Sequence, residues 1–287
     1  MHYVIHGATG AQGAPVLAVL AAAGKPATAL TRTDRPVADD VRTVSADYSS
    51  VTDLTRAYQG AAGVFVHLPL ASEQDRLGYA RNIAAAVAEA RPARVVLSTS
   101  GRIVAGAGHP LLEPADGALT TLIEGLTATG VSFAVIEPRL FLENLLLPTV
   151  IGAARERGEL SYPLPAGLPV SWASHRDIAD AAAALFERPD ITGVIEVGQD
   201  PAITGPDLAE ALGARFGRAV AYRPITPEAF GTSVTPLIGA DAGAGVVGLY
   251  QALGTLPHYA ITPTRSARRL LGVTPRTTGQ WLADLGV

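Results

Sequence analysis

The chain has 287 residues, enough for one large α/β domain or for a core domain with a smaller lobe. Its net charge of −4, with 48% hydrophobic and 17% charged residues, argues against nucleic acid or an anionic membrane as a partner. The absence of cysteine excludes disulfides, thiol catalysis and cysteine-ligated metals. We recognise no signal peptide or membrane-spanning stretch and therefore expect a cytoplasmic protein.

The first predicted elements are a short apolar strand, a glycine-rich turn and a helix. The strand runs into Gly7-Ala-Thr-Gly-Ala-Gln-Gly13, and residues 14–23 are rich in alanine and leucine. In a dinucleotide-binding loop such glycines allow a tight turn, a close approach of the pyrophosphate and helix–strand packing, and the helix N-terminus faces the phosphates. The alternative is a glycine turn with only a structural role. The predicted cofactor-binding residues here are Gly7, Thr9, Gly10, Ala11, Gln12 and Gly13.

The second and third predicted strands narrow the identity of the cofactor. The strand at 26–32 ends in a hydroxyl and a guanidinium, and Arg32 suits the 2′-phosphate of NADP(H) better than the ribose hydroxyl of NAD. Arg32 is alternatively a solvated loop charge, or a partner of Asp34. Asp47 and Tyr48 follow the strand at 42–46, where an adenine is expected, although Asp47 is alternatively the cap of a helix beginning near Val51.

Strands predicted at 63–69, 94–100 and 131–137 alternate with helices at 74–90 and 119–129. This alternation is typical of a doubly wound parallel α/β sheet, the Rossmann architecture, in which ligands collect at the carboxyl ends of the strands. Loops at 101–118 and 158–170 are expected to wall the resulting crevice. The residues expected along it are His67, Leu68, Pro69, Ser98, Thr99, Ser100, Pro138 and Arg139, with Leu68, Pro69, Ser98 and Pro138 assigned to the cofactor.

We predict a dinucleotide-binding domain at 1–150 and a smaller substrate-binding α/β lobe at 151–287, part of which returns to the main sheet. Capped helices are expected after residue 203 and at Thr226. The glycine-rich stretch 236–253 is either weakly helical or a mobile lid. Asp177 is expected to cap a helix at 178–186. Arg265, Arg268 and Arg269 are expected on a solvated helix face.

Several segments resemble one family. The glycine loop, Thr31-Arg32 and the segment Glu137-Pro-Arg-Leu-Phe-Leu-Glu-Asn144 are similar to the NmrA-like branch of the atypical short-chain dehydrogenase/reductases, and segments 174–180 and 271–276 are similar to later parts of it. The resemblance implies a Rossmann domain with a small C-terminal lobe and NADP(H) as the cofactor. It also implies either a reductase or a cofactor-sensing role.

The chain departs from the classical reductases of that superfamily in its lysines. Those enzymes use a Tyr-x-x-x-Lys pair, whose ammonium lowers the pKa of the tyrosine and holds the nicotinamide ribose. Lys25 is the only lysine, and no tyrosine precedes it by four residues. We expect Lys25 at the edge of the sheet opposite the nicotinamide. The helix at 119–129, where many relatives carry a ribose-binding lysine, has Thr120, Thr121 and Glu124 instead.

Hydride transfer needs chiefly positioning, and a proton donor helps by roughly 10²–10⁴-fold for an unactivated acceptor. The predicted catalytic residues are Ser100, which resembles the reductase serine that hydrogen-bonds a substrate carbonyl, and His109 in the loop after its strand. Alternatively, the serine hydroxyls satisfy local backbone groups and His109 is solvated. No metal site is predicted, because the histidines do not cluster with carboxylates at metal-ligand spacing.

An apolar wall for a flat substrate is predicted from Leu140, Phe141 and Trp172. Tyr162, in the cleft loop at 158–170, is expected to contact the substrate and is a further candidate proton donor. Leu140, Phe141 and Trp172 are alternatively part of the core that joins the two lobes. We interpret Glu143 and Asn144 as structural residues that tie loops together.

The sequence therefore favours an NADPH-dependent reductase that delivers hydride to an apolar conjugated small molecule such as a quinone, enone, imine or dye. Two alternatives stay open: a non-catalytic NADP(H) sensor, and a biosynthetic isomerase or cyclase that uses Ser100 or His109. A homodimer also stays open as a further partner.

Overall fold

The computed structural model describes residues 2–33, 36–37, 41–106 and 108–286. The chain divides into two compact units. Unit 1 comprises Met1–Pro138, His175–Val197 and Thr264–Val273, and unit 2 comprises Arg139–Ser174, Gly198–Pro263 and Thr274–Val287. The predicted boundary at residue 150 between a cofactor-binding domain and a substrate-binding lobe stays a prediction.

Unit 1 is built on a seven-stranded sheet in the order β10-β6-β5-β4-β1-β2-β3, and every pairing in it is parallel. The doubly wound α/β fold is therefore confirmed. The strand order reverses at β1, so β1 and β4 flank the switch point at which such sheets bind ligands. The strands are β1 His2–His6, β2 Ala27–Thr31, β3 Arg42–Ser45, β4 Ala61–Val66, β5 Val95–Ser98, β6 Phe133–Pro138 and β10 Gly193–Val197.

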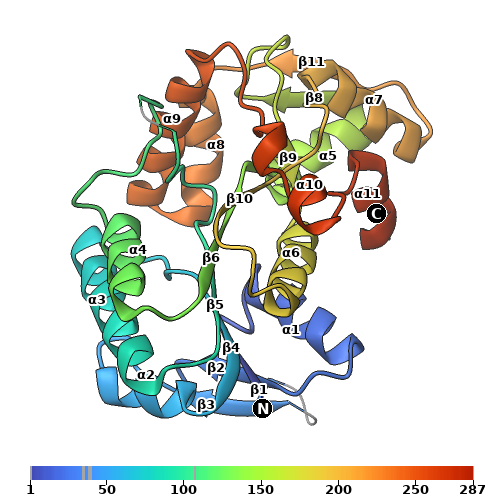
Figure 1. The fold of residues 1–287 in the computed structure, drawn as a ribbon. Helices are drawn as coiled ribbons and strands as arrows, with labels where there is room; N and C mark the ends of the chain where they lie inside the picture. Colours follow the sequence, from blue (N-terminus) through green and yellow to red (C-terminus); the bar gives the residue numbers. More distant parts are fainter. Residues whose placement is uncertain (1, 34–35, 38–40, 107, 287) are drawn as a thin grey trace. The chain divides into compact units, whose positions relative to one another are not determined.

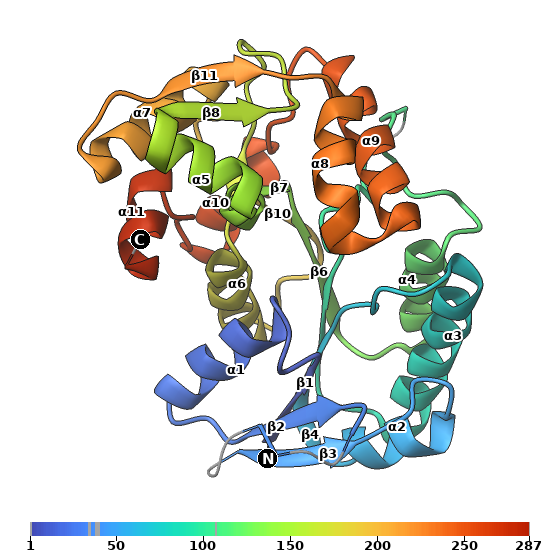
Figure 2. The same ribbon diagram turned by 180° about the vertical axis from the view of Figure 1, so that it is seen from behind.

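Helices cover both faces of this sheet. Figures 1 and 2 show α1 (Gly13–Ala22) and α6 (His175–Glu187) on one face. On the other face lie α2 (Val51–Tyr58), α3 (Glu73–Ala90) and α4 (Ala118–Thr129). Because both faces are covered, β5 is buried along its whole length, as expected for a parallel strand. The core beneath α2, α3 and α4 includes Leu54, Ile83, Leu97, Leu122 and Val135.

Two predictions about the segments that return to unit 1 are wrong. Asp177 does not cap a helix at 178–186, because α6 begins at His175 and Asp177 lies buried in its first turn. Arg265 is not merely solvated: its guanidinium pairs with the fully buried Glu196 of β10 at 2.5 Å. Arg268 and Arg269 are exposed, as predicted, on α10 (Ala267–Leu271).

Unit 2 contains two small parallel sheets, β8 with β11 and β7 with β9. The expected caps are present: Thr204 forms a capping box with Asp207, and the Thr226 hydroxyl accepts from the Ala229 amide. Among the described residues, no helix combines the length and the apolar character needed to cross a membrane. The elements are β7 Leu140–Phe141, η1 Leu142–Leu146, α5 Pro148–Arg157, β8 Glu159–Tyr162, β9 Trp172–Ala173, α7 Gly205–Phe216, β11 Ala221–Pro224, α8 Pro227–Ile238, α9 Ala240–Gly254 and α11 Thr278–Leu285, with η2 Pro263–Arg265 at the last crossing into unit 1.

Buried Arg94 fastens the edge strand β10 to the sheet of unit 1. Its side chain is 2% exposed, immediately before β5. The guanidinium donates to the Ser132 hydroxyl at 2.6 Å, and to the carbonyl oxygens of Pro189 and Ile191, which precede β10. One cation therefore connects the beginnings of β5, β6 and β10.

We expect Arg94→Met to lower the free energy of unfolding by about 2 kcal/mol, because it removes three hydrogen bonds from a buried cation while keeping most of the apolar stem. Arg91→Met is the control, since Arg91 is exposed and makes one hydrogen bond of 3.3 Å to Thr129. Urea denaturation of both variants measures the effect. Equal midpoints for both would contradict the role given to Arg94.

Candidate functional site

The glycine loop after β1 is shaped by contacts that leave no room for a Cβ atom. Gly7 has a φ of +57°, and a Cβ there would lie 2.4 Å from Nε2 of His67. A Cβ on Gly13 would lie 2.3 Å from the carbonyl oxygen of Gly7. The Gly10 amide donates to that same oxygen at 2.7 Å and closes the turn. Gly7 and Gly13 are therefore required by backbone conformation and close packing.

The loop ends at the N-terminus of α1, which has no side-chain cap. Gln12 occupies the N-cap position without a side-chain capping hydrogen bond, and the first turn of α1 holds no acidic residue. The Ala14 amide donates to the Gly10 carbonyl oxygen at 3.0 Å, and Pro15 has no amide proton. The Gln12 and Gly13 amides and the positive end of the helix dipole are therefore what this turn offers to an anion. This donor set, with the cradle that a Cβ would fill, fits the pyrophosphate of a dinucleotide.

Two neutral histidines lie beside and below the loop. Burial lowers the pKa of His67, and its Nε2 atom is buried without a hydrogen-bond partner in the described structure. His6 is fully buried at the end of β1, and its Nε2 lies 2.7 Å from the hydroxyl of Tyr58. Burial, with a smaller contribution from His67, lowers the pKa of His6 to about 3. Both imidazoles are therefore uncharged at neutral pH and add no positive charge beside the glycine loop.

The depressed pKa of His6 predicts a loss of stability in acid. An unfolded histidine takes up a proton below about pH 6.5, whereas folded His6 stays neutral down to about pH 3. Folding is therefore favoured above this window and weakened by about 1.4 kcal/mol per pH unit within it.

We expect the double variant His6→Phe, Tyr58→Phe to lose part of the pH dependence of the unfolding free energy between pH 6 and pH 4.5. The second substitution avoids leaving the Tyr58 hydroxyl without its partner. Urea denaturation across this range measures the slope, and Tyr58→Phe alone is the control. An unchanged slope in the double variant would show that His6 is already protonated in the folded protein.

At the carboxyl ends of β1, β2 and β3, three predicted cofactor residues lie close together. Arg32 is exposed just after β2. Burial raises the pKa of the Tyr48 hydroxyl. The nearby charge of Arg32 and a hydrogen bond with the backbone of Gly7 act in the opposite direction and lower this pKa. Asp34, the suggested partner of Arg32, lies outside the described residues.

Asp47 is exposed, and its Oδ1 accepts from the Ser49 amide at 2.8 Å. Hydrogen bonds from Ser49 lower the pKa of the Asp47 carboxyl. The alternative that Asp47 caps α2 is wrong, because the Ser50 hydroxyl caps that helix by accepting from the Asp53 amide. Asp47 therefore presents an ionised carboxylate to solvent beside Tyr48.

A polar chain joins the glycine loop to the end of β5. The buried Ser98 hydroxyl donates to Oε1 of Gln12 at 2.7 Å, and Nε2 of Gln12 donates to the Ser100 hydroxyl at 2.9 Å. The Ser100 amide donates to the Ser98 hydroxyl at 3.3 Å. Thr99 between them is buried, and its hydroxyl has no partner in the described structure. Ser100 itself is exposed and has a φ of +57°.

The loop after Ser100 is held by a buried carboxylate. Oε2 of Glu137, at the end of β6, accepts from the amides of Val104 at 2.6 Å and Ala105 at 3.1 Å. His109 is half-buried in the same loop, and its Nδ1 accepts from the Leu111 amide at 3.0 Å. In the neutral ring this bond requires the proton to sit on Nε2.

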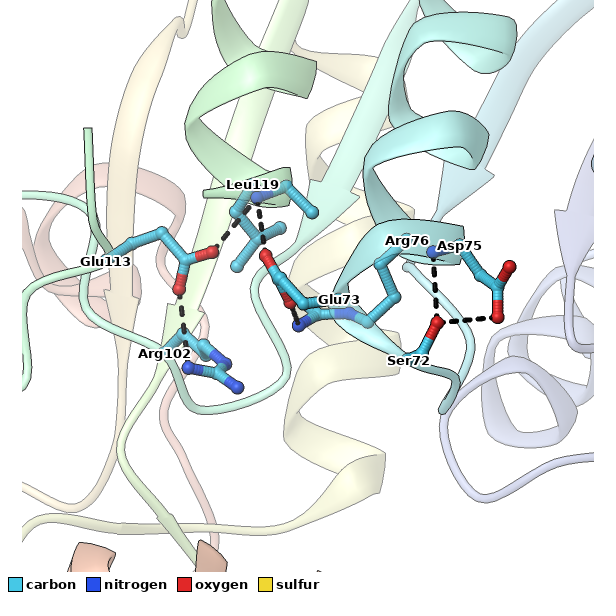
Figure 3. Close-up of polar contacts among 8 residues, drawn as sticks. Ser72, Glu73, Asp75, Arg76, Arg102, Glu113 and Leu119 are labelled. Atoms are coloured by element: carbon cyan, nitrogen blue, oxygen red, sulfur yellow. Dashed lines mark hydrogen bonds and ion pairs between the residues drawn. The ribbon is translucent and has the colours of Figure 1, made fainter. Parts of the chain in front are cut away.

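Two further carboxylates meet at the N-terminus of α4 (Figure 3). Oε1 of Glu73 accepts from the Ala118 amide at 2.8 Å, and Oε1 of Glu113 accepts from the Leu119 amide at 3.3 Å. Arg102 pairs with Glu113 at 3.5 Å. Because Glu73 follows the β4 loop and Glu113 belongs to the β5 loop, both loops are anchored to one helix end.

The loop after β4 exposes an apolar residue, Leu70, that was not among the predicted site residues. Leu68 is buried and Pro69 half-buried, but Leu70 is fully exposed at the carboxyl edge of the sheet. Leu70 directly follows the predicted strand at 63–69, although β4 itself ends at Val66. Pro138 is buried as the last residue of β6, where it pairs with Val197 of β10.

The predicted substrate residues lie in unit 2, most of them in its core. Tyr162 and Trp172 are at most 1% exposed, Leu140 is buried and Phe141 half-buried. The Tyr162 hydroxyl hydrogen-bonds with that of Tyr250. This packing matches the alternative of a core role for Trp172. The prediction that Tyr162 lies in a cleft loop is wrong, because Tyr162 is the buried last residue of β8. Contact with a substrate stays a prediction.

Glu143 and Asn144 make structural contacts within unit 2, as we interpreted them. Oε1 of Glu143 accepts from the Trp281 indole at 3.2 Å. The Asn144 side chain hydrogen-bonds with Tyr162 and Tyr250.

Lys25 lies at the amino edge of the unit 1 sheet, just before β2, and pairs with Glu187 at the end of α6. It is therefore at the edge of the sheet opposite Ser100. Within the described ranges, no three histidine, aspartate or glutamate side chains gather closely enough to hold a metal ion.

The comparisons with known proteins agree with this architecture. The NmrA-like family profile matches residues 2–269. A curated relative, NAD(P)H azoreductase from Xenophilus azovorans, is 30% identical over 283 residues, which cover 96% of this chain and 93% of that protein.

Two solved structures share the fold over almost the whole chain. Citrobacter sp. triphenylmethane reductase has a TM-score of 0.81 at 18% identity and covers 100% of both chains. Escherichia coli NADPH-dependent quinone oxidoreductase in complex with NADPH has a TM-score of 0.74 at 22% identity, covering 99% of this chain and 100% of that one.

Proposed function

The chain belongs to the NmrA-like family, and on this premise we propose that it is an NADP(H)-dependent reductase of small conjugated acceptors. The observation that carries the proposal is the uncapped N-terminus of α1 behind the glycine loop. A structural glycine turn needs no free helix N-terminus, whereas a pyrophosphate uses one. The 30% identical azoreductase supports the reductase activity.

The residues of unit 1 assign parts of the cofactor to parts of the site. The backbone of Gly7, Gly10 and Gly13 and the first turn of α1 accommodate the pyrophosphate. Arg32 binds the 2′-phosphate, because its exposed guanidinium directly follows β2. No carboxylate of the described residues forms an ion pair with this guanidinium. When bound, the dihydronicotinamide supplies a hydride to the acceptor.

The acceptor must be electrophilic enough to be reduced without a Tyr/Lys pair. Lys25 is engaged by Glu187 at the far edge of the sheet, so no ammonium activates a tyrosine. Ser100 is the exposed hydroxyl at the carboxyl end of β5 and donates a hydrogen bond to the acceptor. Relatives are named for azo, triphenylmethane and quinone substrates, all of them conjugated molecules.

We expect Arg32→Ala to weaken NADPH binding by about 10- to 100-fold while NADH binding stays unchanged, because only NADPH carries the 2′-phosphate that forms a charge-assisted bond. Isothermal titration calorimetry with both nucleotides measures the change. Arg42→Ala is the control, since Arg42 is an exposed arginine at the opposite end of the neighbouring strand β3.

We also expect steady NADPH oxidation by the wild-type protein with a quinone, an azo dye or a triphenylmethane dye, followed at 340 nm. Tight NADPH binding without turnover of any acceptor would favour the sensor instead. Conversion of a substrate without net oxidation of NADPH would favour the isomerase or cyclase. Absence of nucleotide binding would overturn both the reductase and the sensor.

A further inference from the structure

The side chain of Gln12 reaches from the glycine loop to the residues at the end of β5. It is 8% exposed and bridges Ser98 and Ser100. Because Gln12 does not cap α1 with its side chain, the amide is free to make this bridge. The bridge connects the glycine loop to the exposed hydroxyl at the end of β5.

The hydrogen bonds of this bridge have a defined direction. The Ser98 hydroxyl accepts a hydrogen bond from the Ser100 amide and donates its own proton to Oε1 of Gln12. The opposite orientation of the Gln12 amide would leave the buried Ser98 proton without an acceptor among the contacts of Ser98 in the described structure. Nε2 of Gln12 therefore donates to Ser100.

This direction determines what Ser100 can do. A hydroxyl that accepts from an amide N–H keeps its own proton for another acceptor. The Ser100 side chain is exposed, so this proton is available outside the protein core. Its φ of +57° is unusual for a residue other than glycine, and such backbone strain is typical of functional sites.

We propose that Gln12 is a positioning residue that orients the Ser100 hydroxyl as a hydrogen-bond donor to the acceptor being reduced. The inference rests on the proposed reductase function and adds a specificity to it. Acceptors that develop negative charge on oxygen or nitrogen, such as quinones and azo compounds, gain from an oriented donor. A cationic triphenylmethane dye is neutralised by hydride and gains little.

The test replaces Gln12 with methionine, which has a similar length and no amide. At saturating NADPH, kcat for a quinone and an azo compound should fall by about 3- to 10-fold, the value of one lost hydrogen bond. Turnover of the triphenylmethane dye should stay within about twofold. Gln74→Met is the matched control, because Gln74 is exposed in the first turn of α3.

A double-mutant cycle separates positioning from a general structural role. Added to Ser100→Ala, the Gln12→Met substitution should lower quinone turnover no further. Urea denaturation of the same four proteins provides a readout independent of activity, in which the two substitutions should be non-additive. Ser98→Ala is a second variant in case Gln12→Met does not fold. It releases the Gln12 amide and should affect the same acceptors to a smaller degree.

Each outcome has a distinct meaning. Equal losses for all three acceptors, or additive effects in the cycle, would overturn the role of Gln12 and leave the reductase proposal intact. A loss confined to NADPH affinity, measured by calorimetry, would assign Gln12 to cofactor binding alone. If none of the tested acceptors supports NADPH oxidation by the wild-type protein, the proposed function fails and the inference fails with it.

Discussion

Steric exclusion at the first turn is the constraint on which the rest of the site depends. Gly7 lies against the imidazole of His67, and Gly13 lies against the backbone at the end of β1. These contacts draw β1, β4 and α1 together at the point where the strand order of the sheet reverses. No side chain caps the N-terminus of α1 at this point, so the Gln12 and Gly13 amides remain as donors there.

The ionisable side chains buried in unit 1 are either uncharged or hydrogen-bonded. The histidines beside the loop stay neutral because burial lowers the pKa of each imidazole. The buried Glu137 is satisfied by two amides of the β5 loop, and Arg94 by oxygen atoms that precede β10. Polar groups of the core thus hold the β5 loop and the β10 edge of the sheet in place.

The sequence was sufficient for the sheet and the glycine loop, because both depend on local periodicity and on spacing that few other structures require. It was not sufficient for Arg265, whose partner Glu196 lies far away in the chain. The side chain of Gln12 was assigned to the cofactor with its loop, since no local pattern reveals the bridge to Ser98 and Ser100. Nor did any pattern reveal that Tyr162 is enclosed by other aromatic rings of unit 2.

The late arrival of β10 in the chain has a consequence for biosynthesis. The edge strand that completes the unit 1 sheet comes after Arg139–Ser174, and α10 comes after Gly198–Pro263. A nascent chain released as far as Pro138 would therefore expose the unpaired edge of β6 and the face of α1 that α6 covers. Vectorial folding on the ribosome must wait for residues beyond 190, and an excised N-terminal fragment is a poor candidate for independent expression.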